Sequence, residues 1–232
     1  MVEKIQAVEI TALGDTHGRH EELPDIDTDI LVFAGDLTQD GSVREAEEFN
    51  RWLGGLDVKH KVVVAGNHDQ CLIGDDAEPR GLLSNATYLE DEKAEIEGLS
   101  FYGMPWVPEL PGPLSALQKS TFVKTRNEMS AKVQGIPEDT DVLLTHAPPR
   151  GLMDRTFLVD PRIPFLRSGS RELRKKVKQV NPRYHIFGHI HNQNSVCQTD
   201  GTVFANVSIS KYQGENHSPK KFTINDAAGR VA

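Results

Sequence analysis

The ten residues from Val8 to His17, VEITALGDTH, decide the fold, because an apolar run ends abruptly in glycine, aspartate and histidine. Four more apolar runs along the chain end in the same manner. Nearly continuous apolar runs of this length are typical of β-strands that are buried on both faces. The five runs are Val8 to Leu13, Asp29 to Ala34, Lys61 to Ala65, Asp141 to Thr145 and Tyr184 to Phe187.

Helical patterns separate the apolar runs. Ser42 is expected to cap a helix, with Glu45 three residues later at the spacing of a capping box. The residues from Leu117 to Val133 and from Ser170 to Val180 also have helical patterns, and the second helix should end at Asn181. Strands that alternate with helices predict a layered α/β domain.

A second set of short strands has the spacing of hairpins, which indicates two sheets packed as a sandwich rather than one open parallel sheet. Ala77 to Ser84 and Pro105 to Gly112 are expected to be loops. No shift in composition marks a boundary, so residues 1–232 are expected to form a single domain. The strands of the second set are Thr87–Leu89, Ala94–Tyr102, Ser195–Gln198, Val203–Val207 and Lys221–Ile224.

The composition disfavours several classes of protein. The 232 residues carry a formal net charge of −8, which argues against stable complexes with nucleic acid or with an anionic membrane. No stretch approaches the ~18 apolar residues that a membrane helix needs, and the N-terminus has no secretory pattern, so we expect a soluble, cytoplasmic protein. Cys71 and Cys197 lack a paired spacing and are expected to be free thiols.

A polar cluster follows each of the five apolar runs. Sites in α/β proteins gather beyond the carboxyl ends of strands, so clusters in that position should converge. Oxygen and imidazole ligands together suit divalent Mn, Fe, Co or Zn. One such cluster alone is common turn chemistry, but five in order, with five of the nine histidines, predict a metal site. The clusters are Gly14-Asp15-Thr16-His17, Gly35-Asp36, Gly66-Asn67-His68-Asp69, Thr145-His146 and Gly188-His189-Ile190-His191.

In order and spacing the clusters resemble the motifs of the calcineurin-like metallophosphoesterases, which are DxH, GD, GNH[DE], H and GHxH. The match extends from residue 15 to residue 191. The stretches FYGMPW (101–106) and LLTHAPPRG (143–151) are similar to the small metallophosphoesterase-domain-containing group of that superfamily. The resemblance implies the calcineurin-like phosphoesterase fold, a four-layer αββα sandwich of two mixed β-sheets flanked by helices.

The resemblance also implies a role for each matching residue. Two divalent metal ions, with manganese favoured, would form a dinuclear centre. His68 would lie near the metals without binding them and would protonate the leaving oxygen. Asp69 could orient His68 or could cap a turn. The implied ligands are Asp15, His17 and His191 for the first ion, Asn67, His146 and His189 for the second, and Asp36 as the bridge.

The implied activity is that of a metal-dependent phosphoesterase, and one departure from the superfamily narrows the substrate. Its protein phosphatases have Asp and Arg at the positions of Gln39 and Asp40, so a phosphoprotein substrate is disfavoured here. We therefore expect a phosphodiesterase that hydrolyses a small phosphate ester such as a cyclic nucleotide. A small-molecule phosphomonoesterase and a non-catalytic metal-binding scaffold are the alternatives.

Each of three side chains close in sequence to these motifs has two possible roles. Arg150 and Arg155 follow His146 and could supply a cation for the phosphate, or could be exposed surface residues. Trp106 could stack on a nucleobase, or could pack the proline-rich loop in which it lies. None of these patterns indicates an oligomeric state.

Overall fold

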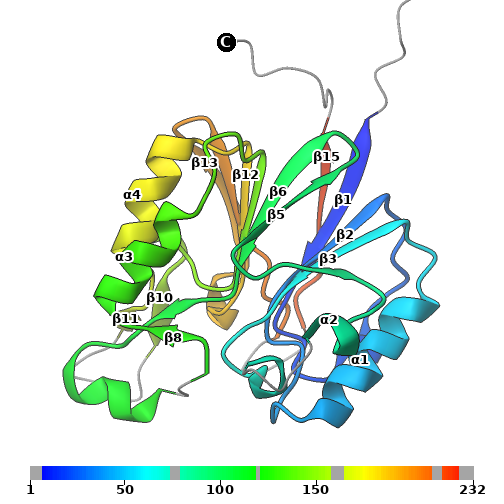
Figure 1. Cartoon of the computed structure of the whole chain (residues 1–232), viewed down its shortest axis with the longest axis horizontal. Coiled ribbons are helices and arrows are strands. Elements are labelled where there is room, and N and C mark those ends of the chain that lie inside the picture. The colour runs from blue at the N-terminus through cyan, green and yellow to red at the C-terminus, as the bar shows by residue number, and fades with distance from the viewer. Residues whose placement is uncertain (1–6, 74–78, 119–120, 158–164, 211–215, 225–232) are drawn as a thin grey trace, which may run out of the picture.

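Two β-sheets pack face to face, and helices cover their outer faces (Figure 1). Helix α1 (Val43–Gly55) covers the first sheet, while α3 (Arg126–Gln134) and α4 (Arg171–Val180) cover the second. The expected four-layer αββα sandwich is therefore confirmed. The structure is a computed structural model, and it describes residues 7–73, 79–118, 121–157, 165–210 and 216–224.

The first sheet has five strands in the order β15-β1-β2-β3-β4. Strands β1 to β4 are parallel, and β15 pairs antiparallel with β1 at one edge. Three of the five apolar runs form the centre of this sheet, which confirms that they are strands. The strands are β1 (Val8–Leu13), β2 (Ile30–Ala34), β3 (His60–Val64), β4 (Thr87–Tyr88) and β15 (Lys220–Ile224).

The second sheet has six strands in the order β13-β14-β12-β9-β6-β5. Its four inner strands are parallel, and hairpins place an antiparallel strand at each edge. The remaining two apolar runs form β9 and β12 at its centre. The strands are β5 (Glu92–Ile96), β6 (Leu99–Met104), β9 (Val142–Thr145), β12 (Tyr184–Phe187), β13 (Ser195–Thr199) and β14 (Thr202–Asn206).

The side chains of strand β2 show how the layers are held together. Ile30 and Val32 belong to the apolar layer between the two sheets. Leu31 and Phe33 point the other way, toward α1, where the ring centroids of Phe33 and Phe49 are 4.7 Å apart. Every residue of β2 is buried, so a continuous apolar run is the sequence that this position in the sandwich requires.

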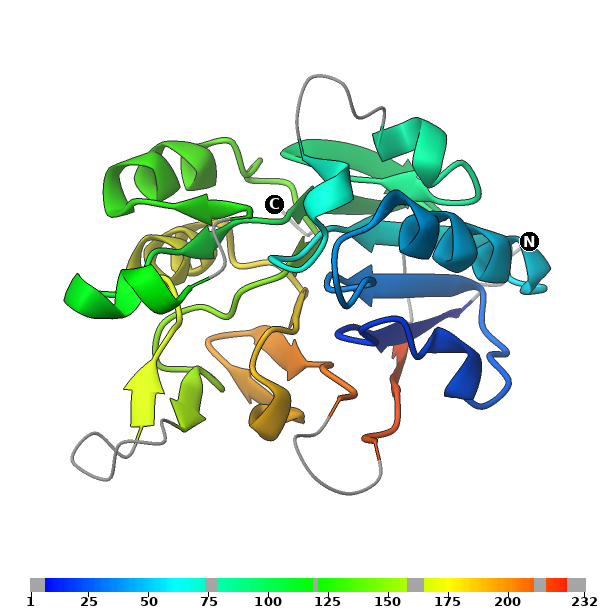
Figure 2. The ribbon, with the colours of Figure 1, turned by 90° about the horizontal axis from the view of Figure 1, so that it is seen from below.

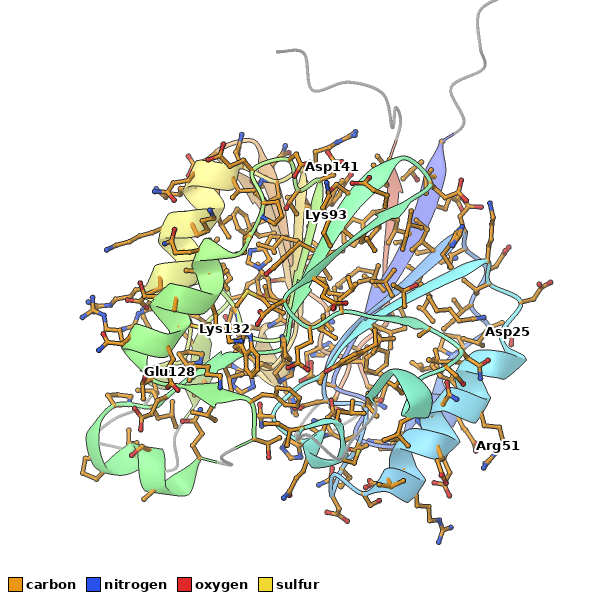
Figure 3. All side chains as sticks on the ribbon, viewed as in Figure 1. Asp25, Arg51, Lys93, Glu128, Lys132 and Asp141 are labelled. Carbon is orange, nitrogen blue, oxygen red and sulfur yellow. The ribbon has the colours of Figure 1, made fainter. Side chains whose placement is uncertain are left out.

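Helices α1 and α4 begin as predicted. The Ser42 side chain accepts a hydrogen bond from the Glu45 N–H, and the Glu45 carboxylate accepts one from the Ser42 N–H, which completes the capping box. Ser170 caps α4, and Asn181 ends it in the left-handed region with a φ of 50°. Charged side chains on the outer side of the helices, such as that of Arg51, face solvent (Figure 3).

The helix predicted from Leu117 to Val133 is wrong in its first half. Helix α3 begins only after Thr125, which forms a capping box with Glu128. The residues just before it form β8 (Val123–Lys124), an extended segment that pairs with β7 (Val107–Pro108). Pairing between segments far apart in the chain thus overrides the local helical pattern. Positions 119–120 of the predicted helix lie outside the described residues.

Two further predictions need correction. Ala94–Tyr102 is not one strand but parts of the β5–β6 hairpin, which turns at Glu97 and Gly98 with φ values of 51° and 73°. Ala77–Ser84 is not wholly a loop, because it contains the short helix α2 (Pro79–Leu82). Positions 77–78 of that predicted loop lie outside the described residues.

The proline-rich stretch from Pro105 to Gly112 is largely irregular, as predicted, although the two residues of β7 lie inside it. Of the helices in the described part of the chain, none is long and apolar enough to cross a membrane. The remaining short elements are η1 (His20–Glu22), η2 (Gln70–Leu72), η3 (Gly112–Leu117), η4 (His191–Gln193), β10 (Arg155–Phe157) and β11 (Phe165–Arg167).

Substitution of Phe49 tests the packing of α1. The Phe49 ring is fully buried and contacts the rings of Phe33, His20 and Trp52. Phe49→Ala should lower the free energy of unfolding by about 3–5 kcal/mol, because it leaves a cavity. Val43→Ala on the same helix should change it by less than about 0.5 kcal/mol, since Val43 is 49% exposed. Urea unfolding measures both variants, and equal losses would contradict this packing.

Candidate metal centre

Each of the five polar clusters lies just beyond the carboxyl end of a parallel strand. Asp15, Asp36 and Asn67 follow β1, β2 and β3 of the first sheet. His146 and His189 follow β9 and β12 of the second sheet. The clusters meet at one end of the sandwich, which Figure 2 shows from below. Both sheets therefore supply side chains to one site.

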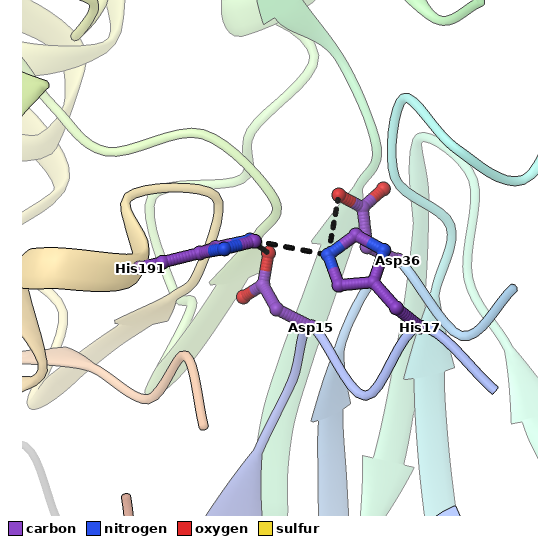
Figure 4. A group of neighbouring side chains, drawn as sticks. All are labelled: Asp15, His17, Asp36 and His191. Atoms are coloured by element: carbon purple, nitrogen blue, oxygen red, sulfur yellow. Dashed lines mark hydrogen bonds and ion pairs between the residues drawn. The ribbon is translucent and has the colours of Figure 1, made fainter. Parts of the chain in front are cut away.

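One group of candidate ligands contains two carboxylates and two imidazoles. A ligand atom of each member lies within 4.8 Å of those of all the others (Figure 4). The Nε2 atoms of His17 and His191 are 3.1 Å apart. His17 Nε2 is 3.8 Å from an Asp36 oxygen, and His191 Nε2 is 3.4 Å from an Asp15 oxygen. The members are Asp15, His17, Asp36 and His191.

A second group adjoins the first and consists of Asp36, His146 and His189. His146 Nε2 lies 3.4 Å from an Asp36 oxygen and 3.1 Å from the amide oxygen of Asn67. The ring centroids of His146 and His189 are 5.0 Å apart. Asp36 is the member common to both groups, so its carboxylate lies where they meet.

The backbone is strained at several candidate ligands. Of the ten non-glycine residues with positive φ in the described ranges, four are candidate ligands. The φ values are 56° for Asp15, 48° for His17, 54° for Asp36 and 68° for His189. A residue with a β-carbon is uncommon in the left-handed region and costs about 1–3 kcal/mol there. Such clusters of strain are typical of functional sites, where a side chain must be aimed.

Glycine is required at two positions where the chain passes against a carboxylate. A β-carbon on Gly66 would overlap an oxygen of Asp36, and one on Gly188 would overlap an oxygen of Asp15. In the structure, the groups that these two glycines approach are the buried carboxylates.

Backbone groups orient the candidate ligands. His146 Nδ1 donates to the Ala34 carbonyl at 2.8 Å, which places a proton on Nδ1 and directs Nε2 into the site. The His189 N–H donates to both oxygens of Asp15 at 3.0 Å. These bonds join the first sheet to the second at the site.

The local charges put two candidate ligands in the forms that bind cations and keep a third protonated in the absence of metal. Burial alone would raise the pKa of the Asp36 carboxyl, but His146 and His17 hold that pKa far below its usual range. Burial lowers the pKa of His189 to about 3. At neutral pH Asp36 is therefore ionised and His189 is neutral, as metal ligands must be. Burial would lower the pKa of His146, but the Asp36 carboxylate raises it to about 9, so His146 would have to release a proton on binding a metal.

The donor atoms fit divalent metal ions. Carboxylate oxygens and imidazole nitrogens in two adjoining groups suit first-row divalent ions. His17 Nε2 and His191 Nε2 can share a hydrogen bond only if one of them carries a proton, whereas a cation would satisfy both lone pairs. The two facing Nε2 atoms therefore indicate a site that is complete only with a cation.

His68 lies beside these groups and belongs to neither of the two that the described residues form. Its ring centroid is 4.6 Å from that of His17, in an edge-on contact. Its Nδ1 donates to the Gln39 carbonyl at 2.9 Å, and its backbone N–H donates to Asp36 at 2.8 Å. The His68 ring thus lies next to the candidate ligands, and its hydrogen bond to Gln39, which is not a candidate ligand, fixes its position.

Asp69 connects the loop after β2 with the loop after β3. One of its oxygens accepts from the N–H of Thr38 at 2.9 Å and from its hydroxyl at 2.8 Å. The other accepts from the N–H of Gly66 at 2.8 Å and of Leu37 at 3.3 Å. Of its two expected roles, these bonds support turn formation.

Trp106 is packed inside its loop. The side chain is 5% exposed, and its indole N–H donates to Asp91 at 2.7 Å. The ammonium groups of Lys124 and Lys132 each lie 4.3 Å from the ring centroid, and Figure 3 labels Lys132 on α3. These contacts favour the packing role over stacking on a nucleobase.

Arg150 and Arg155 take part in loop structure. Arg150 Nη1 donates to the Arg167 carbonyl at 2.7 Å, and Arg150 Nε lies 3.9 Å from the buried Asp154. Arg155 is exposed, and its carbonyl accepts from Asn192, next to His191, at 3.3 Å. These contacts support a structural role for Arg150 and a surface position for Arg155.

Two buried residues that support the site are not identified from the sequence. The Asn206 side chain donates to the carbonyls of Gly188 at 3.4 Å and Ile190 at 3.1 Å. The Ser210 hydroxyl donates to the Asp15 carbonyl. Both therefore fix loops that carry candidate ligands. The signal available was a lone asparagine inside an apolar strand, which must find buried partners.

Gly188→Ala tests the close approach to Asp15. The added methyl group should displace the carboxylate and weaken Mn²⁺ binding by about tenfold or more. Gly55→Ala is the matched control, because its β-carbon would have nothing within 4 Å. Calorimetric titration and metal content after dialysis measure binding, and circular dichroism checks the fold. Equal affinity in the two variants would contradict the prediction.

The chain is similar to proteins of one family along most of its length. The family model for calcineurin-like phosphoesterases matches residues 8–193. UPF0046 protein C25E10.12 of Caenorhabditis elegans is 36% identical over 226 residues, which cover 89% of this chain and 76% of that protein. Human metallophosphoesterase domain-containing protein 1 is 33% identical over 221 residues, which cover 85% of this chain and 64% of that protein.

Two solved structures share the fold. TT1561 of Thermus thermophilus has a TM-score of 0.63 at 15% identity and covers 95% of this chain and 99% of its own. The phosphopantetheinyl hydrolase PptH of Mycobacterium tuberculosis has a TM-score of 0.57 at 17% identity. The match covers 86% of this chain and 88% of that one. At these identities the likeness concerns the fold alone. The family model and the relatives show that the chain belongs to the calcineurin-like phosphoesterase family.

Proposed function

We propose that the protein is a phosphodiesterase that hydrolyses a small substrate, such as a cyclic nucleotide, with a dinuclear metal centre. The position of Asp36 carries the proposal, because its carboxylate belongs to both groups of candidate ligands. A carboxylate common to two adjoining groups can bridge two ions. The family to which the chain belongs supports hydrolysis of phosphate esters.

The proposed centre divides its ligands between two ions. Bound metals would supply Lewis acidity and lower the pKa of a water molecule. We favour manganese, and Fe, Co and Zn suit the same mixture of oxygen and nitrogen ligands. The ligands are Asp15, His17 and His191 for the first ion, Asn67, His146 and His189 for the second, and Asp36 between them.

His68 is the proposed general acid. The Gln39 carbonyl engages Nδ1, so Nε2 is the nitrogen that can reach a substrate. Protonated His68 would donate the Nε2 proton to the leaving oxygen as the bond from phosphorus to that oxygen breaks. The edge-on contact with His17 keeps the ring next to the first group of ligands.

The charges around the site favour a diester. A phosphodiester carries one negative charge and a monoester carries up to two, so the diester needs less positive charge from the protein. Gln39 and Asp40 stand where the protein phosphatases have Asp and Arg, which removes one phosphate-binding cation.

Two other functions remain as alternatives to the phosphodiesterase. A small-molecule phosphomonoesterase would use the same ligands, and a non-catalytic scaffold would bind metal without turnover.

We also propose that residues 1–232 form one domain and that the protein is cytoplasmic. The free thiols of Cys71 and Cys197 are consistent with a reducing compartment.

A panel of chromogenic esters tests the substrate class. With Mn²⁺ bound, the protein should hydrolyse p-nitrophenyl diesters with a higher kcat/KM than p-nitrophenyl phosphate, because the site suits a single negative charge. Dialysis against a chelator should abolish turnover, and added Mn²⁺ should restore it. Much faster turnover of the monoester would support the monoesterase instead, and less than two equivalents of bound metal would argue against the dinuclear centre.

His68→Ala tests the general acid. It should reduce kcat by about 10²–10⁴ for an ester with a poor leaving group and leave the metal content unchanged. His60→Ala is the matched control, because His60 lies at the opposite end of β3 and contacts Glu97 at 2.8 Å. Full activity in a metal-loaded His68→Ala protein would reveal a contaminating enzyme and support the scaffold.

A further inference from the structure

The hydrogen bond at His68 Nδ1 fixes where the proton of the ring lies. The acceptor is the main-chain carbonyl of Gln39, at 2.9 Å. A carbonyl oxygen has no hydrogen to give, so Nδ1 must be the donor. This bond sets the tautomer and the direction of the ring, as a carboxylate does in many catalytic histidines. The element that holds the Gln39 carbonyl in place therefore also orients His68.

Glu45 holds that carbonyl. The Gln39 carbonyl and the Asp40 N–H belong to the same peptide unit, and the Asp40 N–H donates to the two Glu45 oxygens at 3.2 and 3.3 Å. The Gln39 N–H donates to Glu45 at 2.8 Å. The carboxylate thus binds both N–H groups that flank the carbonyl residue. One continuous chain of hydrogen bonds runs from Glu45 through a peptide unit to His68.

We propose that Glu45 is a positioning residue for His68, acting through the Gln39–Asp40 peptide unit. The inference rests on the proposed function, in which His68 protonates the leaving oxygen. An N–H that donates to a carboxylate strengthens the opposite carbonyl as an acceptor, because bonds in a chain polarise one another. Glu45 therefore both places and strengthens the acceptor of the His68 Nδ1 proton.

These contacts exceed what a helix cap needs. The capping box of α1 requires only the bonds between Ser42 and Glu45. The contacts with Gln39 and Asp40 are additional, and Glu45 lies on the other side of the Gln39–Asp40 peptide unit from His68, because the N–H and the carbonyl of a trans peptide point in opposite directions. Burial would raise the pKa of Glu45, but the hydrogen bonds from Ser42, Gln39 and Asp40 lower it, so the carboxylate is ionised at neutral pH.

The loop also contacts the His68 backbone directly. The Thr38 hydroxyl, whose hydrogen is shared with Asp69, lies 3.0 Å from the His68 carbonyl. Gly41 has a φ of 77°, and a β-carbon there would lie 2.7 Å from the same carbonyl. The loop thus passes close to the His68 main chain at Thr38 and at Gly41, while Glu45 binds two N–H groups within the loop. A change at Glu45 should alter the ring contact without releasing the loop.

Glu45→Gln with two metal-loaded diester substrates tests the inference. An alkyl leaving group needs a proton as it departs, whereas p-nitrophenolate departs as the anion. Glu45→Gln should therefore slow hydrolysis of a methyl diester about tenfold or more and that of a p-nitrophenyl diester by less than about threefold. Equal losses on the two substrates would overturn the positioning role.

Two control variants separate positioning from helix capping. Ser42→Ala weakens the same capping box and should lower Tm, yet it keeps the bonds of Glu45 to Gln39 and Asp40. It should not change the ratio of the two rates. Glu48→Gln removes a carboxylate of the same helix that pairs with Arg44 and should change neither rate. A changed rate ratio in Ser42→Ala would overturn the inference.

Two measurements keep this inference apart from the proposed function. Combined with His68→Ala, Glu45→Gln should cause no further loss on the methyl diester, whereas independent effects would multiply. Proton–nitrogen correlation spectra of the metal-free protein report the His68 tautomer without turnover. They should show the proton on Nδ1 in the wild type and a mixture of tautomers in Glu45→Gln. Absence of any activity would overturn the proposed function, and an unchanged tautomer would overturn the role of Glu45.

Discussion

The buried carboxylate of Asp36 constrains the rest of the structure more than any other group at the site. It is 2% exposed, and an unpaired charge in that position would cost several kcal/mol. The backbone N–H of His68 and the rings of His146 and His17 lie around it and stabilise its charge. These partners come from both sheets, so the ends of the sheets must meet where Asp36 lies.

Much of the fold could be predicted because its signals are local. The apolar run of β2 marks a strand buried on both faces, and the Ser42–Glu45 pair marks the start of α1. The error in the helix predicted from Leu117 to Val133 was not local. Residues Val123–Lys124 are extended because they pair with Val107–Pro108, sixteen positions earlier, and no nearby residue indicates that pairing.

The site divides in the same way between local and distant determinants. The order of the clusters placed Asp15, Asp36 and His189 at strand ends, and parallel strands bring such ends together. The support of these residues depends on tertiary geometry. The Asn206 amide reaches the loop after β12 only because β14 lies beside β12 in the sheet. A single position in the chain carries too little information to reveal such a contact.

The division of candidate ligands between two sheets has a consequence for folding. In the proposed centre each ion would join residues after β1, β2 or β3 to residues after β9 or β12, across the interface of the sandwich. Metal would then act as a removable cross-link, and its free energy of binding would add to the cohesion of the two halves. The concentration of available metal ion would then affect the stability of the folded chain as well as the rate of the proposed reaction.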